Sequence, residues 1–245
     1  ERKQGGRVFA DNDMEPTVAL VAHKCGLVFL FGFENNPNFN QYLPELLFHQ
    51  LDTAPSPHSL IFPEVWGTAL AGLIGHQADS FKLLDLSFHR DIFESNNRRW
   101  KAHIPEGFEV WRMDTAITAA FQGIYIPAMV FDSVADFLST GFGFALLTPD
   151  KKVASICYAG PNLSNQVEVA VETAQEYRGR GFAGFAGAAV MEYCIEHGLE
   201  PFWCCDSANT GSRKLALKLG FQEKTEYPIY CWMSEPQTSP FQINT

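Results

Sequence analysis

Residues 167–183 read VEVAVETAQEYRGRGFA, and this stretch decides the fold of the chain around it. Its valines alternate with Glu168 and Glu172, so the pattern predicts a β-strand with one apolar face and one acidic face. A glycine-rich turn follows, and then a helix that is expected to end at His197, with Gly198 at the C′ position. A strand, a glycine-rich turn and a helix N-terminus in this order are typical of an anion-binding site.

The turn between this strand and this helix supplies both space and positive charge. Gly179 and Gly181 have no Cβ atoms that would keep a phosphate group away, and Arg178 and Arg180 can neutralise it. The turn is not a Rossmann dinucleotide site, because no acidic residue ends the next predicted strand, and a Walker A Gly-Lys-Ser/Thr is missing. Two further glycines, three positions apart on the helix, predict a close backbone approach on one helix face: Gly184 and Gly187.

The pattern Arg178-x-x-Gly181-x-Ala183 resembles the Q/R-x-x-G-x-G/A signature of GNAT-type N-acetyltransferases, in which this loop holds the pyrophosphate of coenzyme A. The resemblance continues through a predicted strand at 201–205 and an Asn at position 209, and it closes with Leu-Gly-Phe at 219–221. It covers about residues 106–233. The whole run looks like a bacterial two-domain subgroup that includes zwittermicin-resistance-type acetyltransferases.

The resemblance implies a mixed α/β (α+β) fold, with a twisted GNAT-like sheet flanked by helices. It also implies acetyl-CoA as cosubstrate and direct transfer of the acetyl group to an amine of a small molecule. In such folds the strand before the phosphate loop diverges from the next strand, and a backbone N–H near Val171 polarises the thioester carbonyl. The residues implied to bind the cofactor are Val171, Thr173, Arg178, Gly179, Arg180, Gly181, Phe182, Ala183, Asn209 and Ser212.

Proton transfer needs a base, because an ammonium group cannot attack a thioester. Glu172 lies closer to the loop and is the first choice for this base, while Glu168 could orient the amine. Both could instead be exposed strand carboxylates. Many members of the family have a Tyr as general acid where this chain has Ala216. Substitutes acting through water are left open: Ser207, Tyr227 and Tyr230.

Several of these residues also have structural interpretations. Asn209 is a good helix N-cap by residue type, which is compatible with ligand contact. Trp203 is expected in the core. Cys204 and Cys205 point to opposite sides of a strand, so one of them is expected in the core and neither is needed as a nucleophile.

Composition limits the classes of function. The 245 residues are 46% hydrophobic and carry a formal net charge of −10, which predicts a globular chain without a nucleic-acid partner. No apolar run is long enough for a membrane span, and the first residues lead into no apolar region typical of a signal peptide. The six cysteines form no C-x-x-C pair, so we expect reduced thiols, no metal site and a cytoplasmic location. A monomer or homodimer is also expected.

Two domains are expected, an N-terminal α/β domain of uncertain fold at 1–103 and a GNAT-like domain at 104–245. No internal repeat is visible. Apolar strands are predicted at 26–33, 59–62 and 81–88. His89-Arg90-Asp91 with Asn96 matches letters of a kinase catalytic loop, but the other kinase motifs are missing, and a solvated loop is expected there.

The N-terminal domain carries several phenylalanines that we expect to be buried, with the domain packing on the GNAT-like part and helping to wall the acceptor site: Phe29, Phe31, Phe33, Phe39 and Phe48. The favoured function is N-acetyl transfer. A non-catalytic acyl-CoA-binding or sensory module and a nucleotide-binding α/β protein are the alternatives. The acidic chain is a hint that the acceptor is a cationic amine, such as an aminopolyol or a polyamine.

Overall fold

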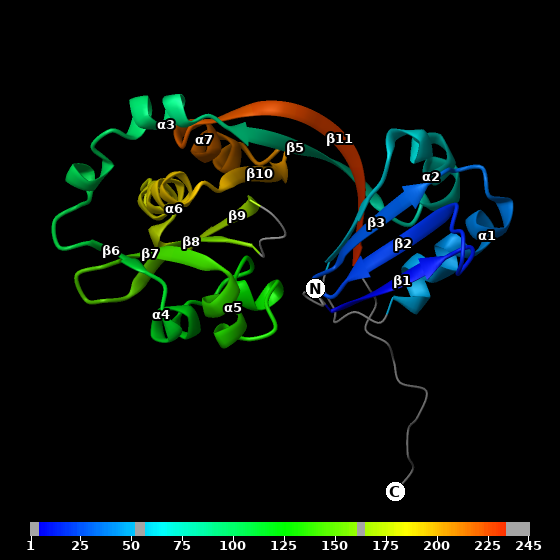
Figure 1. The fold of residues 1–245 in the computed structure, drawn as a ribbon, viewed down its shortest axis with the longest axis horizontal. Helices are drawn as coiled ribbons and strands as arrows, with labels where there is room; N and C mark the ends of the chain where they lie inside the picture. Colours follow the sequence, from blue (N-terminus) through cyan, green and yellow to red (C-terminus); the bar gives the residue numbers. More distant parts are fainter. Residues whose placement is uncertain (1–4, 52–56, 161–164, 234–245) are drawn as a thin grey trace, which may run out of the picture. The chain divides into compact units, whose positions relative to one another are not determined.

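The computed structural model describes residues 5–51, 57–160 and 165–233 (Figure 1). The chain forms two compact units, one made of residues 1–82 and 227–245 and the other of residues 83–226. The chain passes between the units inside two long strands, β5 (Asp79–Phe88) and β11 (Phe221–Met233). The mixed α/β class expected from the sequence is confirmed.

In the first unit a sheet is built in the order β1 (Gly6–Ala10), β2 (Val18–His23), β3 (Leu27–Gly32), β4 (Pro57–Ile61) and the end of β11. β1, β2 and β3 are antiparallel, β4 is parallel to β3, and β11 is antiparallel to β4. The helices of this unit are α1 (Pro37–Glu45), which continues into the π-helical turn η1 (Leu46–Gln50), and α2 (Gly67–Ile74), preceded by the 3₁₀ turn η2 (Glu64–Trp66).

The core of the first unit lies between its helices and one face of its sheet. Alternate residues of β2 and β3 are buried there, together with Leu43, Leu70 and Trp66. On the other face the expectation for the phenylalanines is wrong in part, since Phe31 is 51% exposed and Phe33 is 72% exposed. The alternation of Phe29, Phe31 and Phe33 places these side chains on one face of the sheet. It does not show which face of the sheet the helices cover.

The strands of the second unit follow the order β6 (Glu109–Arg112), β7 (Phe142–Leu147), β8 (Val153–Ala159), β9 (Gln166–Thr173), β10 (Glu200–Asp206) and β5. β6 to β9 are antiparallel, β10 is parallel to β9, and β5 is antiparallel to β10. The helices are α3 (Arg90–Asn97), α4 (Thr115–Ala120), α5 (Val134–Thr140), α6 (Ala183–His197) and α7 (Thr210–Lys218), with 3₁₀ turns η3 (Trp100–His103), η4 (Pro127–Met129) and η5 (Gln175–Tyr177).

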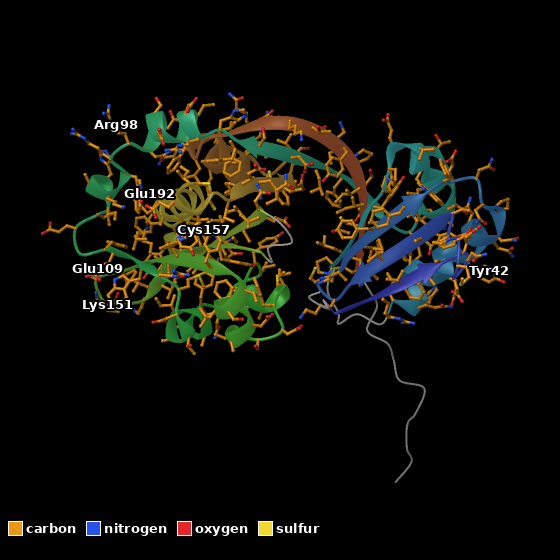
Figure 2. All side chains as sticks on the ribbon, viewed as in Figure 1. Tyr42, Arg98, Glu109, Lys151, Cys157 and Glu192 are labelled. Atoms are coloured by element: carbon orange, nitrogen blue, oxygen red, sulfur yellow. The ribbon has the colours of Figure 1, made fainter. Side chains whose placement is uncertain are left out.

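Helices cover both faces of this sheet. The valine face of β9 packs under α6, as its alternation predicted, and Cys157 of β8 is fully buried in the same cluster (Figure 2). Ala170, on the acidic face of β9, packs in a second cluster with residues of α4 and α5, which lie on the opposite side of the sheet from α6 (Figure 1). α6 ends at Gly198, whose φ of 66° confirms the expected left-handed C-cap.

The two units repeat one strand order, which the sequence did not reveal. The strands β1 to β3 and the strands β7 to β9 are each three antiparallel neighbours, followed by a parallel strand joined by a helix and then by an antiparallel strand from the other half of the sequence. In the second unit β6 adds one more antiparallel strand beside β7. β11 completes the first unit by pairing with β4, and β5 completes the second by pairing with β10. The units therefore have other bounds than the division expected at residues 103 and 104.

Local expectations are met in most places. The strands predicted at 26–33, 59–62 and 81–88 are β3, β4 and β5. The solvated loop expected around His89-Arg90-Asp91 is wrong, because residues 90–97 form α3, stabilised by an ion pair of 2.6 Å between Arg90 and Glu94 one turn apart. A polar stretch with this spacing of opposite charges is compatible with an exposed helix as well as with a loop.

Candidate functional site

The two parallel strands at the centre of the second sheet separate after a short paired stretch. Their pairing joins residues 200–202 of β10 to residues 166–168 of β9. Beyond Phe202 and Glu168, β9 stays paired with β8 as far as Thr173, while β10 stays paired with β5 as far as Asp206. The facing edges of β9 and β10 are therefore open over the second half of each strand, as the resemblance implied.

The backbone register shows which groups face this opening. Glu200 N–H donates to Asn165 O, so odd-numbered residues of β9 turn their backbone groups toward β10. On the other edge Gly160 N–H donates to Glu168 O, so even-numbered residues turn theirs toward β8. The pairing of Phe202 with Glu168 engages the N–H of Val169, so the N–H of Val171 is the first on β9 to point into the opening.

The loop after β9 has the geometry of an anion site. Gly179 and Gly181 both have a φ of 76°, which only glycine adopts without strain, and nothing lies within 4 Å of a Cβ atom placed on either. α6 begins at Ala183, and no side chain caps its N-terminus. The side chain of Phe182 is 8% exposed and packs on Phe108, so Phe182 can offer a ligand only its backbone.

Three cationic side chains lie at or near this loop. Arg178 donates from Nη2 to Glu172 Oε1 at 2.8 Å and from Nε to Thr173 O at 3.0 Å, so its charge is already paired. The guanidinium carbon of Arg180 lies 5.8 Å from the centroid of the Tyr177 ring. The third cation was missed in the sequence: Lys218 Nζ lies 3.5 Å from the position that a Cβ atom on Gly184 would take.

Lys218 could not be found from the local pattern, because α7 brings it to the first turn of α6. The two helices meet where the glycines of α6 leave room, and a Cβ atom on Gly187 would lie 2.5 Å from Leu219 Cδ1. The close approach expected at Gly184 and Gly187 is therefore confirmed, with α7 as the neighbour.

Glu172 is a buried anchor with both carboxylate oxygens engaged. It is 8% exposed, its Oε1 accepts from Arg178, and its Oε2 accepts the backbone N–H of Tyr125 at 3.3 Å. A Cβ atom on Gly123 would lie 2.9 Å from Glu172 Cγ, so this segment approaches the carboxylate closely. Glu172 thus connects β9 to the loop that follows it, through Arg178, and to residues 123–125, through the N–H of Tyr125.

Glu168 has a different environment at the point where β9 and β10 separate. Its side chain is exposed to solvent, yet protein atoms surround its carboxyl group closely enough for desolvation to raise its pKa. The negative charge of Asp85 on β5 raises this pKa further. A carboxyl group that has a raised pKa and keeps contact with solvent suits a base.

At the start of α7 the predicted residues serve structural bonds. Asn209 Oδ1 accepts from Ser212 N at 3.0 Å, so the N-cap role of Asn209 is confirmed. Ser212 Oγ accepts from Trp203 Nε1 at 2.9 Å, and Trp203 is 2% exposed, in the core as expected. Cys205 is the buried member of the cysteine pair, and desolvation raises the pKa of its thiol.

The candidates for the general acid fall in different places. Ala216 is fully buried, so the usual acid position carries no acid and faces the core. Tyr230 belongs to the first unit, where its ring stacks on Phe62 at 5.6 Å. Tyr227 also belongs to the first unit. Ser207 directly follows β10 and is partly buried.

No helix among the described residues is long and apolar enough to cross a membrane. Within residues 5–51, 57–160 and 165–233, no three His, Cys, Asp or Glu side chains are grouped so as to hold a metal ion. The arrangement instead combines backbone donors, a loop suited to phosphate and a carboxyl group of raised pKa in one unit. These are the groups needed to hold a phosphorylated cosubstrate and to remove a proton.

The chain is similar to known proteins along almost its whole length. YdfB, an uncharacterized N-acetyltransferase of Bacillus subtilis (strain 168), is 28% identical over 228 residues, which make up 92% of this chain and 85% of that protein. A GCN5-related N-acetyltransferase-like protein from Streptococcus suis has the same fold, with a TM-score of 0.72 at 22% identity, over 93% of this chain and 88% of its own.

A tandem GNAT protein from the clavulanic acid biosynthesis pathway matches with a TM-score of 0.57 at 12% identity, over 92% of this chain and 81% of its own. These matches include both units, so the repeated strand order occurs within a known architecture. A sequence model of the GNAT acetyltransferase family matches residues 2–230. The chain belongs to the GNAT acetyltransferase family.

Proposed function

We propose that this protein transfers the acetyl group of acetyl-CoA directly to an amine of a small molecule. The separation of β9 and β10 carries the proposal, because it leaves the N–H group of Val171 open on the strand that leads into the glycine loop and the uncapped start of α6. A pantetheine chain could pair with the open edge of β9 as a further strand does. The amide of Val171 is the proposed donor to the thioester carbonyl.

The loop is proposed to hold the pyrophosphate of the cosubstrate. The N–H groups of residues 179–183 and the dipole of α6 favour a bound anion, and the two glycines leave space for it. Arg178 is paired with Glu172, so we assign it to shaping the loop. Arg180 and Lys218 are the proposed counter-charges. Asn209 and Ser212 are proposed to contact the cofactor only through groups left free by their structural bonds.

The two glutamates are proposed to have roles opposite to those expected from the sequence. Glu168 is the proposed general base, since its pKa is raised and it lies where the strands separate. Glu172 is the proposed positioning residue, since both of its oxygens already accept hydrogen bonds. The amine nitrogen bonds to the thioester carbon as the carbon–sulfur bond breaks, the electron pair leaves on sulfur, and the amine proton goes to Glu168.

The leaving thiolate needs no strong acid, because its pKa is about 8.5, judged from cysteine. Ser207 is the proposed source of a proton through water, as it lies in the same unit as the loop. The acceptor is proposed to be a cationic amine, such as an aminopolyol or a polyamine. We also propose membership of the two-domain subgroup with zwittermicin-resistance-type enzymes, a cytoplasmic location, and a monomer or homodimer.

The test is turnover of acetyl-CoA with a panel of amines, preceded by a thermal-shift screen of CoA esters. A shift with acetyl-CoA and release of CoA with at least one amine are expected. Binding of acetyl-CoA without turnover of any amine would favour a non-catalytic acyl-CoA module. Preference for dinucleotides over CoA would overturn the cofactor assignment.

A further inference from the structure

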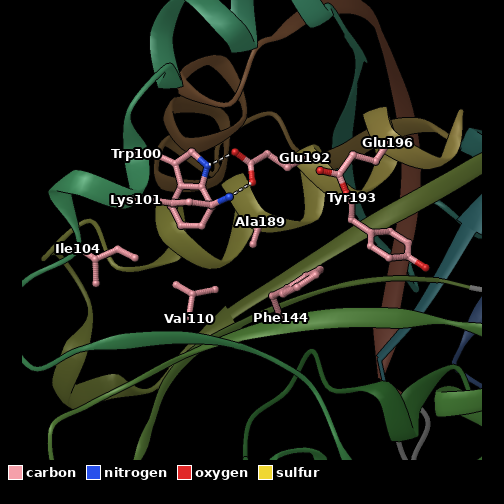
Figure 3. Close-up of a pocket in the computed structure, with 9 residues that line it drawn as sticks. All are labelled: Trp100, Lys101, Ile104, Val110, Phe144, Ala189, Glu192, Tyr193 and Glu196. Carbon is pink, nitrogen blue, oxygen red and sulfur yellow. Dashed lines mark hydrogen bonds and ion pairs between the residues drawn. The ribbon is translucent and has the colours of Figure 1, made fainter.

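A second concave site lies in the same unit, and nothing in acetyl transfer uses it (Figure 3). It has a volume of about 450 Å³ and lies between η3, the strands β6 and β7, and one face of α6. Its α6 residues recur at helical spacing and face it from one side of the helix: Ala189, Glu192, Tyr193 and Glu196. The volume is within the range of small-molecule sites.

The floor of the cavity is apolar and aromatic. Ile104, Val110 and Phe144 line it opposite Ala189, and Trp100 forms one wall (Figure 3). Trp100 is 7% exposed, so its indole is already set into the core of the unit. A ligand placed on this floor would bury apolar surface without moving the core.

The wall of the cavity is held by a network of hydrogen bonds. Trp100 Nε1 donates to Glu192 Oε1 at 2.8 Å, and Lys101 Nζ lies 2.7 Å from Glu192 Oε2. Lys101 Nζ is also 5.3 Å from the centroid of the Trp100 ring. Figure 3 shows both bonds meeting at the Glu192 carboxylate. The charges of Lys101 and Glu192 cancel, and the indole is fixed in orientation.

Glu196 leaves one negative charge uncompensated at this cavity. It lies one helical turn after Glu192, a spacing at which two like charges destabilise a helix. Among the described residues the structure gives Glu196 no hydrogen bond or ion pair. A second hollow of about 600 Å³ adjoins the cavity, sharing Lys101, Glu192 and Glu196, and Arg98 lines it. Arg98 forms no ion pair with Glu196 among the described residues, so the Glu196 carboxylate is left for a ligand cation.

We propose that this cavity binds an organic cation with an aromatic or branched alkyl body, whose ring rests on the Phe144–Val110 floor and whose ammonium group pairs with Glu196. Charge complementarity selects the cation, and the aromatic walls add to its attraction. The guanidinium carbon of Arg112 already lies 5.1 Å from the centroid of the Tyr193 ring, so one aromatic ring of the cavity already has a cation against it. The proposal does not rest on acetyl transfer.

The test is calorimetric titration of the full chain, without acetyl-CoA, with 2-phenylethylamine, its neutral analogue 2-phenylethanol, the anion 3-phenylpropionate, and ethanolamine, which lacks the ring. The aromatic amine is expected to bind about tenfold more tightly than the alcohol, which corresponds to about 1.4 kcal/mol. The anion and ethanolamine are expected to bind more weakly still. Equal affinity for amine and alcohol, or no binding of the amine, would overturn the proposal.

Variants locate the bound amine. Glu196→Gln should remove the tenfold preference for the amine, and Arg98→Ala should leave it unchanged or increase it. The matched control Glu200→Gln removes an exposed carboxylate outside the cavity and should change nothing. Glu168→Gln separates this site from the proposed acceptor site. If Glu168→Gln abolishes binding of the amine and Glu196→Gln does not, the amine occupies the acceptor site and the proposal is wrong.

Discussion

Gly181 allows the phosphate role of the loop to be tested with a single charge. Its φ of 76° and the open space around it mean that a side chain there would meet strain but no clash. Asn and Asp tolerate this conformation better than other residues and have nearly the same shape. Gly181→Asn and Gly181→Asp therefore differ in charge alone, at the place proposed for the pyrophosphate.

The size of the effect follows from Coulomb's law. Two unit charges at about 4 Å repel by about 4 kcal/mol at an effective dielectric constant of 20. The loop is exposed at Gly179, Arg180 and Gly181, so solvent and Arg180 screen part of this repulsion. We expect a net loss of about 2 kcal/mol, so Gly181→Asp should bind CoA about 30-fold more weakly than Gly181→Asn in calorimetry.

Gly198 supplies the matched control at the other end of α6. Its φ is 66°, and nothing lies within 4 Å of a Cβ atom placed on it either. Gly198→Asp and Gly198→Asn should lower the melting temperature about as much as the changes at Gly181, because the backbone strain is similar. They should leave CoA affinity unchanged. Equal affinity of Gly181→Asp and Gly181→Asn, with both proteins folded, would refute the phosphate assignment.

The remaining predictions concern the base and the backbone. Glu168→Gln should lower turnover by about 10²–10⁴-fold and leave CoA affinity intact. Glu172→Gln should also weaken CoA binding, because Glu172 holds the loop through Arg178. Steady-state kinetics and calorimetry separate the two outcomes. Because the pKa of Glu168 is raised, kcat/KM should increase with pH through a value above the usual carboxyl range, and Asp85→Asn should move this limb to lower pH. Gly220→Ala should lower the free energy of unfolding by about 3 kcal/mol in urea, because its φ is 92° and a Cβ atom would lie 2.6 Å from a backbone nitrogen of α3. Gly198→Ala, which meets strain without a clash, should lower the free energy of unfolding by about 1–2 kcal/mol.

The local parts of the site could be predicted from the sequence, because they depend on neighbouring residues. Alternation along β9 gave its two faces, and glycines gave the turn and the end of α6 at Gly198. The N-cap role of Asn209 followed from residue type. Each of these features is fixed within a few residues of chain, where side-chain period and backbone freedom act directly.

Contacts between distant segments could not be predicted in the same way. The pairing of Glu172 with Arg178 and with Tyr125 depends on how a turn and a segment 47 residues away fold back on β9. Lys218 reaches the first turn of α6 only through helix packing. The place of β5 beside β10 joins residues more than a hundred positions apart, and hydrophobic alternation predicts a strand but not its partner.

The repeated strand order raises the question of why the cofactor loop is proposed for the second unit alone, and the start of each crossover helix answers it. At the start of α1, Asn36 Oδ1 accepts the N–H of Phe39 at 3.0 Å, and Pro37 has no N–H to offer. The last residue of β3, Gly32, has its carbonyl occupied by Trp66 Nε1 at 3.0 Å. The first unit thus satisfies these groups with its own side chains. The start of α6 has no side-chain cap. Gly184 N–H and Phe185 N–H bond to backbone carbonyls, and the N–H groups before them are the ones proposed for a ligand, so we expect one cosubstrate site in each chain.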